Sequence, residues 1–244
     1  LVQEMESIEA LARVTVLCTD KTGTITTGNL QVTETIPLAD MDEDHIREVM
    51  AAMNGAFSDV NVTQDALIKY FGKKNDWSIS DSIPFSSARK FRAAAFGDNG
   101  SYALGAPEFL VKDNQKILDM IDDYSDQGYR VLMLGKCAAI SSADDSVSSV
   151  KPVAAIVISD IIKTDAAETF KYFADAKVAV KVISGDNPRT VSAVAVKAGV
   201  ENGDKYIDAT TLPNTLPELQ KVISNYTVFG RVKPEQKQLF VKAW

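Results

Sequence analysis

The sequence predicts an α/β protein in which a Rossmann-like, parallel-sheet domain is interrupted by an inserted, largely antiparallel α/β domain. Strand-then-helix alternation marks both ends of the 244-residue chain, as in parallel sheets with helical crossovers. The middle instead carries short strands with hairpin signals, such as the turn Gly97-Asp98-Asn99-Gly100. The length is enough for two modest cores. We expect one domain at 1–28 and 160–244 and the inserted domain at 29–159.

The first elements follow from apolar runs and their stop signals. Met5 to Ala12 is expected to be a short helix, and Val14 to Cys18 a strand that is central in its sheet and buried on both faces. A Ser/Asp-rich segment, 141–149, is expected to be a mobile loop. The other elements expected in the insertion are strands at 30–36, 91–96, 101–104, 130–135 and 153–158 and helices at 42–54, 64–70, 107–112 and 115–125.

Alternation returns after Asp160. Pro188 and Gly199 bound one helix in the way that prolines begin and glycines end helices. The expected helices are 166–174, 188–198, 217–224 and 233–244, and the expected strands are 178–183 and 226–229.

Composition restricts the function classes. The formal net charge of −7 argues against a nucleic-acid binder, which needs a basic face. The two cysteines have no metal-ligand spacing, and a single possible pair is weak evidence for a disulfide, so a reducing, cytosolic setting is favoured. No run approaches the roughly 18 to 20 apolar residues that cross a bilayer, and the last helix lacks a stop signal. We therefore expect a soluble, monomeric piece of a longer protein.

One segment indicates a specific chemistry, phosphoryl transfer to a carboxylate: Asp20-Lys21-Thr22-Gly23-Thr24-Ile25-Thr26. It places a carboxylate at the carboxyl end of a predicted strand, where open α/β sheets hold their active sites. A carboxylate there can accept a phosphoryl group as an acyl phosphate and release it to water. Lys21, backbone N–H groups of the following turn and a metal ion are the expected means of offsetting the phosphate charge.

This seven-residue segment resembles the phosphorylation signature of the P-type cation-transporting ATPases, a branch of the haloacid-dehalogenase-like superfamily, and matches it at every position. The resemblance implies a haloacid-dehalogenase-like fold, ATP and Mg²⁺ as cofactors, and Asp20, Lys21 and Thr22 as catalytic residues. Asp20 and Thr22 are the implied metal-binding positions.

Two further segments resemble motifs of the same family. Ser184-Gly185-Asp186-Asn187 resembles its Thr-Gly-Asp-Asn motif, with Ser184 keeping the hydroxyl, and implies Ser184, Gly185 and Asp186 as catalytic residues. The helix that follows adds the positive end of its dipole. The segment from Arg231 to Lys237 resembles the one whose lysine neutralises the transferring phosphate, which implies Lys237.

The inserted domain carries segments that resemble the family's nucleotide site. Phe85-Ser86-Ser87-Ala88-Arg89-Lys90 implies Phe85 as an aromatic platform for the base, with Arg89 beside it. Leu104-Gly105-Ala106-Pro107-Glu108 resembles Lys-Gly-Ala-Pro-Glu, with Leu104 where the lysine is expected; Gly105 permits close approach of the base. The remaining implied contacts are Arg130, a polar residue at Gln64 or Asp65, and Asp160 and Lys163 in a hinge segment where lysine replaces arginine.

These resemblances imply the nucleotide-binding and phosphorylation portion of a bacterial cation pump, on the cytoplasmic side of a multi-pass plasma-membrane protein. Its partners would be ATP and a cation carried by transmembrane helices that the chain lacks. The family's Gly-Asp-Gly-x-Asn-Asp motif is missing, so we expect this piece to phosphorylate poorly. Two alternatives stay open: a soluble haloacid-dehalogenase-like phosphatase, which typically has an aspartate where Thr22 stands, and a non-catalytic nucleotide-binding module.

Overall fold

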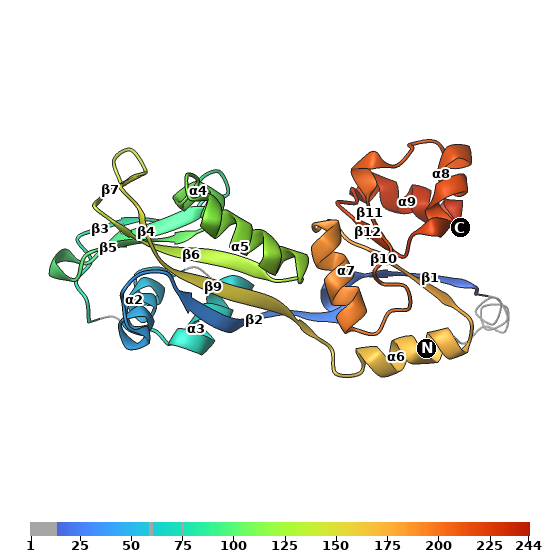
Figure 1. Ribbon diagram of the computed structural model, residues 1–244, viewed down its shortest axis with the longest axis horizontal. Coiled ribbons are helices and arrows are strands. Elements are labelled where there is room, and N and C mark those ends of the chain that lie inside the picture. Colours follow the sequence, from blue (N-terminus) through green and yellow to red (C-terminus); the bar gives the residue numbers. More distant parts are fainter. Residues whose placement is uncertain (1–13, 59–60, 75) are drawn as a thin grey trace. The chain divides into compact units, whose positions relative to one another are not determined.

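The computed structural model describes residues 14–58, 61–74 and 76–244, so the helix expected at Met5 to Ala12 lies outside the described residues. The chain forms two compact units (Figure 1). Unit 1 contains the described residues up to Gly28, Asp126–Gly128 and Ile161–Trp244; unit 2 contains the described residues of Asn29–Ser125 and Tyr129–Asp160.

Unit 1 is built on a parallel sheet. Its strand order is β1 (Val16–Asp20), β10 (Ala179–Ile183), β12 (Val228–Gly230) and β11 (Tyr206–Asp208), and every pair is parallel. Within the described residues β1 is an edge strand, half-buried over most of its length, so the expectation of a central, doubly buried strand is wrong here. A β-branched apolar run indicates a strand but does not tell how many neighbours that strand has.

Helices cover both faces of this sheet. Val182 and Val228 point into a core with α6 (Ala166–Asp175) and α7 (Pro188–Lys197). The next residue of each strand, Ile183 or Phe229, points to the other face, which is covered by α8 (Leu216–Val222) and α9 (Pro234–Ala243). This alternation is the two-residue period of a strand buried on both sides.

Unit 2 contains a six-stranded sheet in the order β2 (Thr26–Pro37), β9 (Lys151–Ile162), β6 (Arg130–Cys137), β5 (Ser101–Gly105), β4 (Phe91–Ala95), β3 (Asp81–Ile83). The pairs from β9 to β3 are all antiparallel. One face packs on α2 (Glu43–Gly55) and α3 (Val62–Phe71), the other on α4 (Pro107–Leu110) and α5 (Gln115–Asp126) (Figure 1). The predicted α/β fold class is confirmed.

The segment expected to be a loop at 141–149 contains part of a small hairpin instead. Strands β7 (Ala139–Ser141) and β8 (Ser146–Ser148) pair antiparallel. The hydroxyl of Ser146 donates to the Asp144 carboxylate across the turn, at 2.7 Å. Ladder hydrogen bonds come from the main chain, so a polar, serine-rich sequence can still form a hairpin once its turn is stabilised.

Gly230 sets the distance between β12 and the start of α7. A Cβ placed on Gly230 would lie 2.4 Å from both N and Cα of Pro188, the first residue of α7. We expect Gly230→Ala to lower the free energy of unfolding of unit 1 by about 2 to 3 kcal/mol, because the backbones must separate to admit the methyl group. Urea denaturation measures the loss. Gly185→Ala, whose methyl group would approach only the Val232 carbonyl at 3.8 Å, is the control and should change stability much less.

Candidate functional site

Asp20 ends β1 and faces a lysine from the far end of the chain. The Lys237 ammonium, on the first turns of α9, lies 2.6 Å from Oδ2 of Asp20. The other carboxylate oxygen accepts the backbone N–H of Thr22, at 3.3 Å. Both charged side chains keep over two-fifths of their surface exposed, so a phosphate group in solution can reach the carboxylate beside the positive charge of Lys237.

The turn after Asp20 reverses the chain. Residues Lys21–Ile25 form it, and Gly23 has φ = +77°, a left-handed conformation that disfavours a side chain. Thr22, Gly23 and Thr24 are exposed, whereas Lys21 and Ile25 are buried. The turn therefore exposes its hydroxyl and glycine segment to solvent beside Asp20 and anchors itself through the two buried side chains.

Lys21 is fully buried and paired. Its side chain has 0% exposure, and its ammonium lies 2.8 Å from Oδ2 of Asp186. An ammonium without solvent requires such a partner, because desolvation of an isolated charge costs several kcal/mol. The pair joins the turn after β1 to the turn after β10.

The turn at Ser184–Asn187 is fixed by main-chain bonds to its neighbours. Ser184 is buried, its N–H donates to the Phe229 carbonyl, and its hydroxyl accepts the N–H of Asp186. Asn187 caps α7 by accepting the N–H of Arg189. The structure thus brings together, at the carboxyl ends of adjacent strands β1 and β10, all of the residues expected to be catalytic: Asp20, Lys21, Thr22, Ser184, Gly185, Asp186 and Lys237.

The donor set for a metal is small. Among the described residues, no cluster of three or more His, Cys, Asp or Glu side chains could hold a metal ion. Mg²⁺ commonly takes only one or two carboxylates and completes its shell with water and substrate phosphate. The carboxylate of Asp20 and the oxygens of Thr22 are suited to that kind of binding, and they are too few to surround a metal ion with protein ligands alone.

Unit 2 has its own pocket, a hollow of about 390 Å³ on the α3 side of β4 and β5. Phe85, half-exposed, and Gly105 line it as expected, and so does Gln64. A Cβ on Gly105 would lie 2.4 Å from the Lys90 carbonyl oxygen, so glycine is required for the close pairing of the two strands here. Leucines from three elements make the wall apolar: Leu67, Leu104 and Leu132.

Other expected nucleotide contacts lie elsewhere. Arg89 binds the Asp145 carboxylate at 2.5 Å and the Pro84 carbonyl oxygen at 2.7 Å. Arg130 lies 3.9 Å from the carboxylate of Asp160, and neither residue lines the pocket. Lys163 belongs to unit 1, where its N–H donates to the Ile25 carbonyl. The described lining includes none of these four residues, nor the exposed Asp65.

Two cationic residues that line the pocket escaped the sequence analysis, Lys90 and Arg92. Lys90 directly follows Arg89 in the motif, and with φ = +61° it leads the chain out of the turn at Ser87–Arg89 into β4. Strand periodicity could have found Arg92, because it shares a face with the buried Ala94. An arginine at a core position indicates a paired or functional side chain, because charged residues are rarely buried otherwise.

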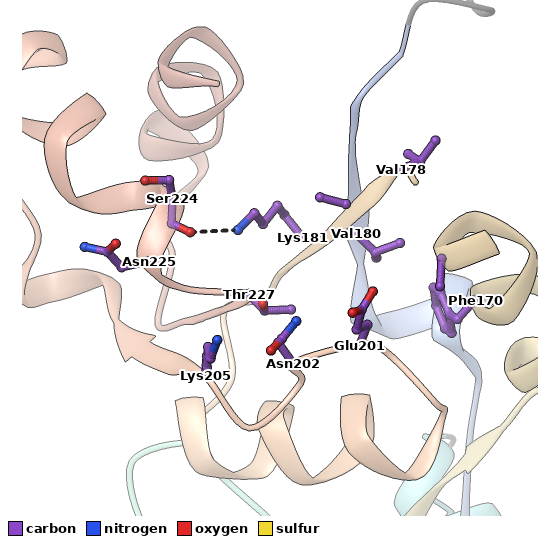
Figure 2. A pocket seen from close by; sticks show the side chains of 12 residues that line it. Phe170, Val178, Val180, Lys181, Glu201, Asn202, Lys205, Ser224, Asn225 and Thr227 are labelled. Carbon is purple, nitrogen blue, oxygen red and sulfur yellow. Dashed lines mark hydrogen bonds between the residues drawn. The ribbon is translucent and has the colours of Figure 1, made fainter. Parts of the chain in front are cut away.

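A second hollow, of about 350 Å³, lies in unit 1 at the amino ends of β10 and β12, the opposite end from Asp20. Lys181 lines it and donates to the carbonyl oxygen of Ser224, at 3.4 Å (Figure 2). It also donates to the carbonyl oxygen of Tyr226. Burial lowers the pKa of Lys181 and raises that of Cys18 beside it. These contacts assign the Lys181 ammonium to holding the loop before β12.

Residues 14–244 match the haloacid dehalogenase-like hydrolase family, and the chain belongs to that family. Its relatives are named as cation-transporting ATPases. The chain is 36% identical over 243 residues to the calcium-transporting ATPase CtpE of Mycolicibacterium smegmatis, and 36% identical over 249 residues to the probable cation-transporting ATPase exp7 of Streptococcus pneumoniae. These alignments cover 99 to 100% of this chain but only 30 to 31% of the relatives.

A solved structure shares the fold. The crystal structure of a zinc-transporting PIB-type ATPase in an E2.Pi state matches 94% of this chain and 35% of its own, with a TM-score of 0.65 and 19% identity. The chain therefore resembles P-type cation-transporting ATPases in sequence and fold, as the motifs indicate. No helix in the described part of the chain is long and apolar enough to cross a membrane.

Proposed function

We propose that this chain binds ATP through unit 2 and accepts its terminal phosphoryl group on Asp20 of unit 1, as the energy-coupling part of a P-type cation pump. One observation carries the proposal: the Asp20 carboxylate ends a parallel strand with the Lys237 ammonium 2.6 Å away. A nucleophile and a charge that can follow the phosphoryl group are the two parts that phosphoryl transfer to a carboxylate requires.

The transfer has two steps. A carboxylate oxygen of Asp20 attacks the γ-phosphorus of ATP, the bond to the β,γ-bridging oxygen breaks, and ADP leaves with the electron pair. Water then attacks the phosphorus of the acyl phosphate, which regenerates the carboxylate and releases inorganic phosphate and a proton. Dividing the displacement in this way replaces one high barrier by two lower ones.

The charges around Asp20 change partners during transfer. Phosphorylation removes the negative charge of the Asp20 carboxylate, so its attraction for Lys237 is lost while three phosphoryl oxygens come within reach. The exposed Lys237 side chain is long enough to follow them. Lys21, held in place by Asp186, keeps its charge buried beneath the turn and supplies a fixed positive field.

Mg²⁺ fits as the cofactor that offsets phosphate charge in this reaction. Asp20 and Thr22 would hold it, and their oxygens leave most of its shell to water and phosphate. Thr22 cannot serve as a general acid in the way that a carboxylic acid would, so water attack on the acyl phosphate lacks that assistance. A phosphorylated intermediate that lasts suits a pump that must move between conformations.

For the nucleotide, we propose the pocket lined by Phe85, Gln64 and Gly105. The exposed ring of Phe85 offers a stacking surface at its mouth, and the volume of about 390 Å³ is in the range of small-molecule sites. Lys90 also lines the pocket and carries a positive charge suited to the phosphate chain.

We expect Phe85→Ala to weaken ATP binding by about tenfold or more, because loss of base stacking costs about 1–3 kcal/mol. Isothermal titration of the chain with ATP measures it. Phe109→Ala is the matched control, since Phe109 is 48% exposed against 50% for Phe85, belongs to the same unit and does not line the pocket. Equal affinities of the two variants would contradict the assignment of the pocket.

The parent protein would couple this chemistry to cation movement through transmembrane helices, with the chain on the cytoplasmic side of the membrane. Calcium is the first cation to test, because the mycobacterial relatives are named as calcium-transporting ATPases. Uptake of labelled Ca²⁺ into vesicles that contain the full-length protein, with and without ATP, tests the coupling; Mg²⁺ is the natural comparison, given the magnesium-transporting relative of Salmonella typhimurium.

A further inference from the structure

Arg92 lies at the inner end of the unit 2 pocket. Its side chain is only 5% exposed, yet it lines the hollow together with Gln64 and Leu104. In the ladder between β4 and β5, Arg92 stands directly opposite Leu104. Side chains opposite each other in an antiparallel pair share a face and have Cβ atoms about 5 Å apart.

Leu104 occupies the position at which the matching nucleotide motif has a lysine. The guanidinium of Arg92 therefore enters the same wall of the pocket from the adjacent strand. A lysine at position 104 would repel the Arg92 guanidinium, whereas the apolar Leu104 side chain does not. Compared with the matching motif, the positive charge stands on β4 instead of β5 but on the same face of the sheet.

The guanidinium is held in a fixed orientation. Its Nη1 donates to Oε1 of Gln64 at 2.5 Å, and its Nη2 donates to Oδ1 of Asn54 at 3.3 Å. Gln64 in turn donates to the same oxygen of Asn54, at 3.4 Å. The guanidinium carbon also lies 5.1 Å from the centre of the Phe57 ring.

This network decides which groups the pocket offers. Arginine has donors and no acceptor, and the carbonyl oxygen of Gln64 already accepts from Arg92 while one N–H of its amide donates to Asn54, so this network offers the pocket donors and no side-chain acceptor of Gln64. A donor-rich inner end matches acceptor atoms on a ligand. Purine ring nitrogens are such acceptors, and a 6-oxo group is a stronger one.

We infer that Arg92 replaces the lysine absent at position 104 and is the residue that recognises the base of a purine nucleotide, through acceptor atoms on the ring. This inference rests on the proposed nucleotide-binding function. Gln64 and Asn54 are positioning residues that fix the guanidinium.

The test compares ATP with ITP, which carries a 6-oxo group in place of the amino group. In isothermal titrations of the whole chain, we expect Arg92→Met to weaken ATP binding by about tenfold and ITP binding by more, since a hydrogen bond to a charged donor contributes about 1.5–3 kcal/mol. Arg92→Lys should recover part of the loss. Arg92→Met combined with Leu104→Lys should recover more, because it returns the cation to the other strand.

Matched controls separate recognition from folding. Arg47→Met removes an exposed arginine of the same unit that stacks on Tyr70 outside the pocket, and should leave both affinities unchanged. Loss of unit 2 structure would lower ATP and ITP binding alike and would not be rescued by Leu104→Lys. The inference is supported if Arg92→Met changes the ratio of the ATP and ITP affinities and Leu104→Lys restores binding. An equal loss of affinity for both nucleotides, or no loss, overturns it.

Its failure is distinguishable from failure of the proposed function. If the unmodified chain binds neither nucleotide at millimolar concentration, the nucleotide-binding proposal fails and this inference falls with it. If the unmodified chain binds ATP and Phe85→Ala weakens that binding while Arg92→Met does not, only the role of Arg92 is refuted.

Discussion

Asp20→Asn should abolish phosphoenzyme formation, by at least about 10³-fold, because the amide is nearly isosteric with the carboxylate but cannot attack phosphorus. The measurement is acid-stable incorporation of ³²P from γ-labelled ATP. The sample is a protein that contains this chain and is as long as the related ATPases. ATP binding should persist, since the proposed nucleotide pocket lies in unit 2. Hydroxylamine should release the label from the unmodified protein, as it does from acyl phosphates.

The matched control is Asp175→Asn, which neutralises an exposed aspartate at the end of α6 in the same unit. It should leave labelling unchanged. Undiminished labelling of Asp20→Asn would refute the assignment of the nucleophile, and with it the proposed function.

The second large effect concerns the stability of the buried pair of Lys21 and Asp186. Asp186→Ala should cost about 3 kcal/mol, because the Lys21 ammonium stays desolvated after losing this carboxylate. Lys21→Met should cost much less, since Asp186 keeps 38% of its side chain exposed and water can solvate it. The double variant should be more stable than Asp186→Ala alone.

Urea denaturation of unit 1 measures these differences. Trp244 packs on Phe229 and Phe240 in unit 1, whereas Trp77 packs on Phe96 in unit 2. In a Trp77→Phe background the tryptophan emission therefore reports on unit 1 alone, which avoids fitting a two-domain protein to one transition. Equal destabilisation by Lys21→Met and Asp186→Ala would show that burial of the ammonium is not the source of the effect.

Much of the fold follows from local patterns. Helix α7 begins at Pro188 and ends just before Gly199, as capping rules predict. The hairpin of β4 and β5 forms around the Gly97–Gly100 turn. The edge position of β1 could not be predicted, because strand order depends on which distant segments pair, and apolar periodicity carries no information about that.

The candidate site was likewise predictable only in part from the sequence. Strand ends predicted that Asp20 and Ser184 would lie near each other, because carboxyl ends of parallel strands share one edge. Motif context selected Arg89 as a nucleotide contact, but in the structure its guanidinium binds Asp145. Spacing within a motif does not tell which of two adjacent side chains, Arg89 or Lys90, enters a pocket, because the turn at Ser87–Arg89 and the left-handed backbone of Lys90 (φ = +61°) set the directions of both.

The sequence by itself determined which carboxylate we propose as the nucleophile, because Asp20, a lysine and a glycine-hinged turn are consecutive residues. Only the tertiary structure decided which charges meet. Lys237 reaches Asp20 across 217 positions, Asp186 accompanies Lys21 into the interior, and Arg92 comes to stand opposite Leu104. Each of these pairs depends on strand register and helix packing, and long-range burial supplies the free energy that sets both.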